Sequence, residues 1–111
     1  MGGSKKKYPV SDLKFKLIIG NEAESDLLDA VKWYEENLMG LGSNFLASAD
    51  TTIQSIIQSP EKYPKVFKNI RRALIRKFPF GVHYLIDKEK IIILAVFHFR
   101  RNPKHWKYRI K

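Results

Sequence analysis

The chain has 111 residues, no cysteine, and 21 Lys or Arg against 11 Asp or Glu, which gives a formal net charge of +10. This length predicts one domain, and the lack of cysteine excludes disulfides and thiolate chemistry and favours a reducing cytoplasm. No stretch approaches the roughly 18 apolar residues of a membrane span, and so positive a chain favours phosphate-rich or acidic partners.

The N-terminus is set apart from the rest of the chain by its composition. Met1 to Ser4 (MGGS) is typical of a cloning scar or linker, and the three lysines that follow are not succeeded by the apolar segment of a signal peptide. We therefore treat residues 1–12 as a flexible segment and expect residues 13–111 to form a single domain.

The first half of that domain predicts a strand and two helices. Residues 13–19 (LKFKLII) alternate apolar and basic side chains before becoming wholly apolar, as in a strand. Asn21 and Glu24 have the spacing of a capping box, and apolar residues then recur at threes and fours up to Leu38. After Gly40 and Gly42 a second apolar stripe runs to residue 58. The short link between the stripes predicts an antiparallel helical hairpin.

The second half predicts a loop and three strands. Residues 59–69 hold two prolines, and the periodicity then changes to two over residues 70–78, 82–87 and 90–99, with short turns between them. The last run contains IIILAVF, as expected for an interior strand. The expected fold class is α+β in two layers: an N-terminal strand, an antiparallel helical hairpin, and a three-stranded antiparallel meander (β-α-α-β-β-β). One face of a four-stranded sheet would lie on the hairpin, and the other would be largely open.

Cations in the first strand after the helices are candidates for binding. Strand alternation predicts Arg72 and Arg76 on one face, and Arg71 and Lys77 on the other. Two interpretations stay open: a basic face that meets phosphate, or a solvated edge strand whose charges protect against aggregation.

The three histidines lack the spacing of a metal site and no carboxylate cluster accompanies them, so we expect no metal. His83 is expected to be a packed or half-exposed sheet residue. His98 lies where the buried strand emerges, and nearby cations would keep it neutral and able to accept a proton. A histidine that only makes structural hydrogen bonds at the strand end is the alternative.

The C-terminal segment interleaves cations with rings, and its candidate binding residues are Arg100, Arg101, Trp106 and Tyr108. Rings that stack on bases beside cations that neutralise phosphate are typical of single-stranded nucleic-acid binding. Equally, Trp106 could fold back onto the sheet and leave the cations in water.

Three segments carry a family resemblance: AVKWYEENLMGLGSNFL, SPEKYPKVFKNIRRALIRKFPFGVHYLI and IIILAVFHFRRNPKHWKYR. Together they resemble the RelE/ParE superfamily, the toxins of bacterial type II toxin–antitoxin systems that are also called plasmid stabilisation proteins. The resemblance covers most of residues 13–111 and implies a toxin domain with the fold predicted above. It also implies a cytoplasmic growth inhibitor that needs no cofactor and is neutralised by a cognate antitoxin with an acidic or amphipathic segment.

The superfamily leaves the target open. RRALIRKFPF and ILAVFHFRR resemble ParE-like members, which poison DNA gyrase without cutting anything. The alternative is a RelE-like, metal-independent endoribonuclease that cuts mRNA on the ribosome, and whether the chain is an enzyme stays open. The resemblance would then assign catalysis to His98, Arg72, Arg76 and Arg100. A non-toxic accessory domain that binds nucleic acid is a remoter alternative.

Overall fold

The computed structural model describes residues 15–100 and confirms the predicted α+β fold class. Its elements are β1 (Lys16–Ile19), α1 (Asn21–Asn37), α2 (Leu41–Gln58), β2 (Lys65–Phe67), β3 (Ile70–Leu74), β4 (Phe80–Asp87) and β5 (Lys90–His98). The N-terminal segment 1–12 lies outside the described residues. Within residues 15–100 no helix is long and apolar enough to cross a membrane.

The strands form one mixed sheet in the order β1-β5-β4-β3-β2. β3, β4 and β5 pair antiparallel, so the predicted meander is confirmed, and β1 adds to β5 in parallel. β5 is an interior strand, as expected. The sheet has five strands rather than four, because β2 forms within the segment predicted to be a loop. This strand has three residues and is too short to show a period of two; it follows Pro64 and ends before Lys68, whose φ is 52°.

The predicted strand over residues 70–78 was too long. β3 ends at Leu74, and residues 75–79 form the turn that leads into β4. The turn closes where the Ile75 N–H donates to the Phe80 carbonyl at 2.9 Å, and Lys77 adopts a left-handed φ of 72°. Phe80 and Gly81 were expected in a turn but belong to β4. Ile75 lies beyond the end of β3, yet it is buried. The alternation of buried and exposed residues therefore continues past the strand and into the turn.

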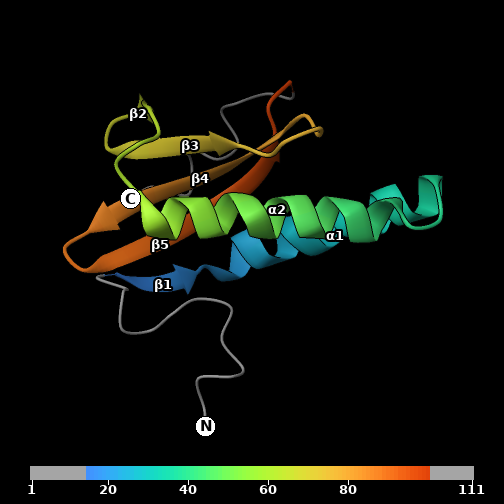
Figure 1. Ribbon diagram of the computed structural model, residues 1–111, viewed down its shortest axis with the longest axis horizontal. Coiled ribbons are helices and arrows are strands. Elements are labelled where there is room, and N and C mark those ends of the chain that lie inside the picture. Colours follow the sequence, from blue (N-terminus) through green and yellow to red (C-terminus); the bar gives the residue numbers. More distant parts are fainter. Residues whose placement is uncertain (1–14, 101–111) are drawn as a thin grey trace, which may run out of the picture.

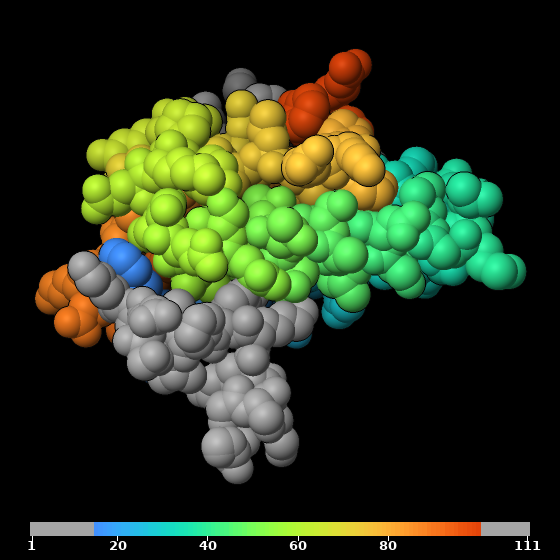
Figure 2. Space-filling view, in the orientation of Figure 1, coloured from blue at the N-terminus to red at the C-terminus, as the bar shows by residue number. Residues whose placement is uncertain are grey.

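The helical hairpin covers one face of the sheet, with α1 packed along β5 and α2 over β3 and β4 (Figure 1). Four rings meet in the resulting core: Tyr34 and Phe45 stack with centroids 5.2 Å apart, and Phe78 and Phe80 contact both. The hairpin extends past the sheet, and its tip projects from the body of the molecule (Figure 2). The predicted apolar stripes therefore do face the sheet.

The starts of the two helices differ from expectation. Gly20, not Asn21, is the N-cap of α1, and no side chain caps it. Gly40 is the N-cap of α2 with a left-handed φ of 88°, and Gly42, expected to precede the second helix, lies buried in its first turn. Glycine fits Gly40 because it carries no Cβ to oppose a left-handed conformation.

A carboxylate connects α1 to the sheet where β1 ends. β1 pairs with β5 only as far as Ile93, so later N–H groups on that side of β5 have no strand partner. Asp26 Oδ2 accepts the Val96 N–H at 3.0 Å. The second turn of α1 thus continues the hydrogen bonding that β1 begins.

β5 contains a bulge that changes the facing of its last residues. His83 pairs with Ala95, whereas the next residue, Tyr84, pairs with Ile93, so Leu94 is an extra residue on β5. Ile93 and Val96 pack in the main core with the helices, whereas Leu94 and Ala95 both belong to a smaller cluster on the opposite side. The bulge therefore puts Val96 and His98 on the helix side and Phe97 on the opposite side.

Candidate binding face of the sheet

We call the side of the sheet that faces away from α1 and α2 the outer face. Strand alternation from β3 puts Ile70, Arg72 and Leu74 on it, because Ala73 and the next inward residue, Ile75, pack in the core with the helices. Ile70 is fully buried in the small outer cluster with Ala95. The outer face is thus partly covered by its own apolar side chains and less open than expected.

Arg72 is a half-buried cation of this face. It pairs across the strands with His83, and its side chain lies over Gly81 of β4. A Cβ at Gly81 would be only 2.9 Å from both Cγ and Cδ of Arg72. Within residues 15–100 no hydrogen bond or ion pair engages the Arg72 guanidinium. Among the described residues, Arg72 thus has a stem held against the sheet and a guanidinium that no hydrogen bond or ion pair engages.

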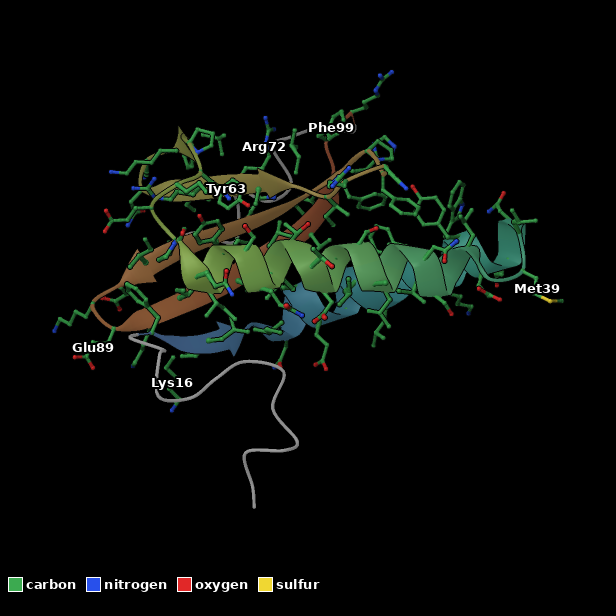
Figure 3. The ribbon with its side chains drawn as sticks, viewed as in Figure 1. Lys16, Met39, Tyr63, Arg72, Glu89 and Phe99 are labelled. Atoms are coloured by element: carbon green, nitrogen blue, oxygen red, sulfur yellow. The ribbon has the colours of Figure 1, made fainter. Side chains whose placement is uncertain are left out.

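Apolar residues surround Arg72. The outer cluster joins the buried Ile70 and Ala95 to partly buried neighbours from β2 and β5: Val66, Phe67, Leu94 and Phe97. Leu74, the next residue of β3 on the same face as Arg72, is 53% exposed. Arg72 is labelled in Figure 3. On the described strands of this face Arg72 lies among apolar side chains, and the Lys68 Nζ lies 5.4 Å from the ring centroid of Phe67.

His83 is buried on the outer face, with 1% of its surface exposed. It lies between Arg72 and Ala95 in the cross-strand row, and its ring centroid is 6.1 Å from that of Phe97. The expectation of a packed sheet residue is confirmed. Within residues 15–100 no three His, Asp or Glu side chains are grouped as metal ligands.

Arg71 faces the opposite way and holds a loop. Its Nη1 donates to the carbonyl oxygens of Glu61 and Tyr63 at 3.0 and 2.6 Å. Beside it the Tyr84 hydroxyl donates to the Pro60 carbonyl at 2.6 Å, in a fully buried position. Burial raises the pKa of Tyr84 to about 12, although the Arg71 charge acts in the other direction. Arg71 thus stabilises residues 60–63, a role that its position in the sequence did not indicate.

Arg76 and Lys77 lie in the turn between β3 and β4, and both are exposed. They do not continue the alternation of β3, because that strand ends at Leu74. The prediction that Arg72 and Arg76 share one strand face was therefore wrong. The prediction that Arg71 and Lys77 share the other strand face was wrong for the same reason.

His98 lies on the helix side of the sheet. It pairs with Phe80, a core residue, and the two ring centroids are 5.2 Å apart. Its Nδ1 accepts the Arg100 backbone N–H at 3.2 Å. Cross-strand partners share a face, so His98 shares the face of Phe80, whereas Arg72 lies on the face of His83. The structure does not bring together the four predicted catalytic residues.

The remaining predicted binding residues are near or beyond the end of β5. Arg100 is exposed in the turn after Phe99, whose backbone N–H donates to the Pro79 carbonyl at 2.9 Å. Arg101, Trp106 and Tyr108 lie outside the described residues, so their roles stay predictions.

Sequence reasoning did not single out Gly81, Leu74 or Phe97. Gly81 was expected in a turn, although a glycine within a strand often marks a close approach of other atoms. Phe97 was missed because the facing of residues after Leu94 depends on the bulge.

Comparisons with known proteins agree on one family. The family model described as the ParE toxin of the type II toxin–antitoxin system, parDE, matches residues 17–103. Toxin ParE2 of Mycobacterium tuberculosis, from strains CDC 1551 / Oshkosh and ATCC 25618 / H37Rv, is 30% identical over 89 residues, which cover 79% of this chain and 85% of the relative.

A solved structure described as the chromosomal ParDE TA system from P. aeruginosa has the same fold. Its TM-score is 0.70 at 15% identity, and the match covers 77% of this chain and 96% of that chain. The geometry of the sheet and hairpin and the family match over residues 17–103 lead to one conclusion. The chain belongs to the ParE toxin family of type II toxin–antitoxin systems.

Proposed function

We propose that this protein arrests bacterial growth in the cytoplasm by binding DNA gyrase, and that a cognate antitoxin with an acidic or amphipathic segment neutralises it. Membership of the ParE family supports the toxin role. The net charge of +10 supports an acidic partner, because opposite charges steer association and favour a matched surface.

The observation that carries the choice of a protein target is the chemistry around Arg72. Nucleic-acid binding faces neutralise phosphates with several cations. Protein interfaces instead combine an apolar centre with a few charges, and arginine is enriched among their dominant residues. The described outer face has Arg72 among Ile70, Leu74, Ala95 and Phe97, which fits the second kind.

The position of His98 also favours binding over RNA cleavage. A general base and the cations that stabilise a phosphorane must converge on one phosphate. His98 packs against Phe80 on the helix side, while Arg72 lies on the outer face and Arg76 lies in a turn. The strand segments 70–74, 80–86 and 91–98 also contain no Asp or Glu that could replace the histidine.

The decisive experiment compares two cell-free assays with the same purified protein. We expect inhibition of gyrase-catalysed DNA supercoiling and no ribosome-dependent cleavage of mRNA. His98→Gln should inhibit supercoiling as strongly as the parent chain, because a binding poison needs no proton transfer at that ring. A ribonuclease would instead lose activity by about 10²–10⁴ in that variant.

A test in cells addresses the toxin role separately from the target. Induced expression of the chain alone should stop growth, and co-expression of the small gene next to it should restore growth. Normal growth despite abundant, folded protein would contradict the toxin role. Arrest without any effect on supercoiling would retain the toxin role and overturn the gyrase target.

A further inference from the structure

We infer that Gly81 is a positioning residue: its missing side chain lets Arg72 lie flat on β4 and present its guanidinium to a carboxylate of a protein partner. The inference rests on the proposed function for the identity of that partner. It concerns a contact between neighbouring strands that involves Gly81, a residue that the family likeness did not single out.

The contact between the two residues is close. An added Cβ at Gly81 would come within 2.9 Å of both Cγ and Cδ of Arg72 and within 3.6 Å of Leu74 Cδ2. Carbon atoms in favourable contact are about 3.5–4.0 Å apart. The stem of Arg72 thus occupies the volume that a side chain at position 81 would need, and an alanine there would force the stem to move.

The backbone of β4 does not itself require glycine at this position. Among the described residues Gly40 is the glycine with a positive φ, whereas Gly81 lies inside a strand and pairs with Leu74 and Phe97. Glycine weakens a strand interior because it loses more conformational freedom than other residues. Glycine at position 81 is therefore explained by the Arg72 stem, which fills the space that a side chain at this position would occupy.

A stem held against the sheet favours binding through the guanidinium. Arginine has many rotamers, and ordering them upon binding opposes association. The contact with Gly81 orders the stem before a partner arrives, and the apolar neighbours keep competing water away from one side. A carboxylate suits the site because it can accept two parallel hydrogen bonds from one guanidinium.

Nuclear magnetic resonance can test the contact and the binding on purified protein. In the parent chain we expect nuclear Overhauser effects between Gly81 Hα and the Arg72 methylene protons, and a rigid Arg72 Nε–Hε vector. A decaglutamate peptide serves as the carboxylate probe, and the Arg72 Nε–Hε signal reports its binding. Gly81→Ala should weaken that binding about tenfold, which corresponds to the loss of one charge-assisted hydrogen bond.

Growth inhibition supplies a second readout through a double-mutant cycle. Gly81→Ala and Arg72→Ala should each raise the dose needed for arrest. The double variant should behave like Arg72→Ala, because without the arginine stem the new methyl group displaces nothing. Circular dichroism melting should show that Gly81→Ala is at least as stable as the parent chain.

Three results would overturn the inference: a mobile Arg72 side chain in the parent protein, unchanged decaglutamate binding in Gly81→Ala, or additive effects in the cycle. The first of these needs no variant, so it decides even if Gly81→Ala does not fold. A parent chain that fails to arrest growth would contradict the proposed function instead, while the resonance measurements would still decide the positioning role.

Discussion

Glu35 of α1 caps the start of α2: its Oε1 accepts the Gly42 N–H at 3.0 Å, and its Oε2 accepts the Gly40 N–H at 3.0 Å. The N-cap residue Gly40 has no side chain that could do this. A carboxylate at this position also interacts favourably with the positive end of the helix dipole. One side chain of the first helix therefore satisfies two backbone donors of the second.

Replacement of Glu35 should destabilise the hairpin without affecting the outer face. We expect Glu35→Ala to lower the free energy of unfolding by about 1–2 kcal/mol, as for the loss of an N-cap, and Glu35→Gln to lose less because it keeps one acceptor oxygen. Urea unfolding measures this. Glu36→Ala, a change at an exposed neighbour, is the control and should leave the unfolding midpoint nearly unchanged. Equal effects at both positions would contradict the capping role.

Gly42 allows the two helices to approach closely. A Cβ at this position would lie 2.6 Å from the Val31 carbonyl oxygen and 3.0 Å from Glu35 Cβ. Alanine normally favours a helix by about 1 kcal/mol over glycine, yet we expect Gly42→Ala to destabilise by about 1–3 kcal/mol because the helices must separate.

Gly40→Ala provides a comparison for Gly42→Ala. No atom lies within 4 Å of a Cβ at position 40, but φ is 88°. Its expected cost of about 1–2 kcal/mol is therefore conformational. Thermal melting of both variants, with a crystal structure of Gly42→Ala, separates the two causes: only Gly42→Ala should change the distance between the helices.

Tyr84 should make stability depend on alkaline pH. Its hydroxyl is buried against the Pro60 carbonyl, and burial raises its pKa to about 12, above the ordinary value of 10.0. The folded state thus keeps the proton more tightly than the unfolded state. This contribution is complete below pH 10 and is lost as the pH rises through about 12.

Tyr84→Phe isolates that contribution. At neutral pH it should destabilise the protein by about 1–3 kcal/mol, because the buried Pro60 carbonyl loses its donor. Chemical unfolding at pH values from 7 to above 10 should show a steeper loss of stability for the parent chain than for the variant. Parallel curves would show that Tyr84 does not titrate between the folded and unfolded states as expected.

Arg71 and Arg72 are neighbours in sequence and should have opposite phenotypes. Arg71→Ala removes both hydrogen bonds to the loop carbonyls and should lower the free energy of unfolding by about 1–3 kcal/mol. Its toxicity per folded molecule should remain. Arg72→Ala should unfold at nearly the parent midpoint but need a higher dose for growth arrest. Each variant is the charge-matched control for the other, and a loss of toxicity in both would argue for a general electrostatic effect.

Local patterns predicted the elements well. The helical hairpin followed from two apolar stripes, because every helical turn repeats the period of 3.6 residues, and Tyr34 of the first stripe lies in the core. The strand ends were less predictable. Ile75 continues the apolar alternation of β3 although the strand ends at Leu74, so the sequence pattern does not show where the strand ends. The left-handed backbone conformation at Lys77, which forms the turn, is not visible in that pattern. The three residues of β2 were too few to show a period.

The site depends on relations between distant residues, which local patterns do not contain. Arg71 and Arg72 look alike in the sequence, yet one holds a loop and the other faces outward. The capping role of Glu35 could not be predicted, because its partners Gly40 and Gly42 reach it only after the chain reverses direction. His98 and Arg72 likewise lie on opposite faces of the sheet, which the bulge in β5 determines.

The extra residue at Leu94 also affects how this family should be aligned. Leu94 is extra relative to β4, so deleting its codon would restore regular pairing and keep Phe97 on the outer face and the ring at position 98 on the helix side. Loss of the bulge with every residue retained would instead turn Phe97 towards the helices and the ring at position 98 towards the face of Arg72. Two homologues of equal length would thus expose different residues after this point if only one of them had the bulge. When binding residues are transferred between members, the facing of this strand should therefore be read from its bulge and not from sequence position alone.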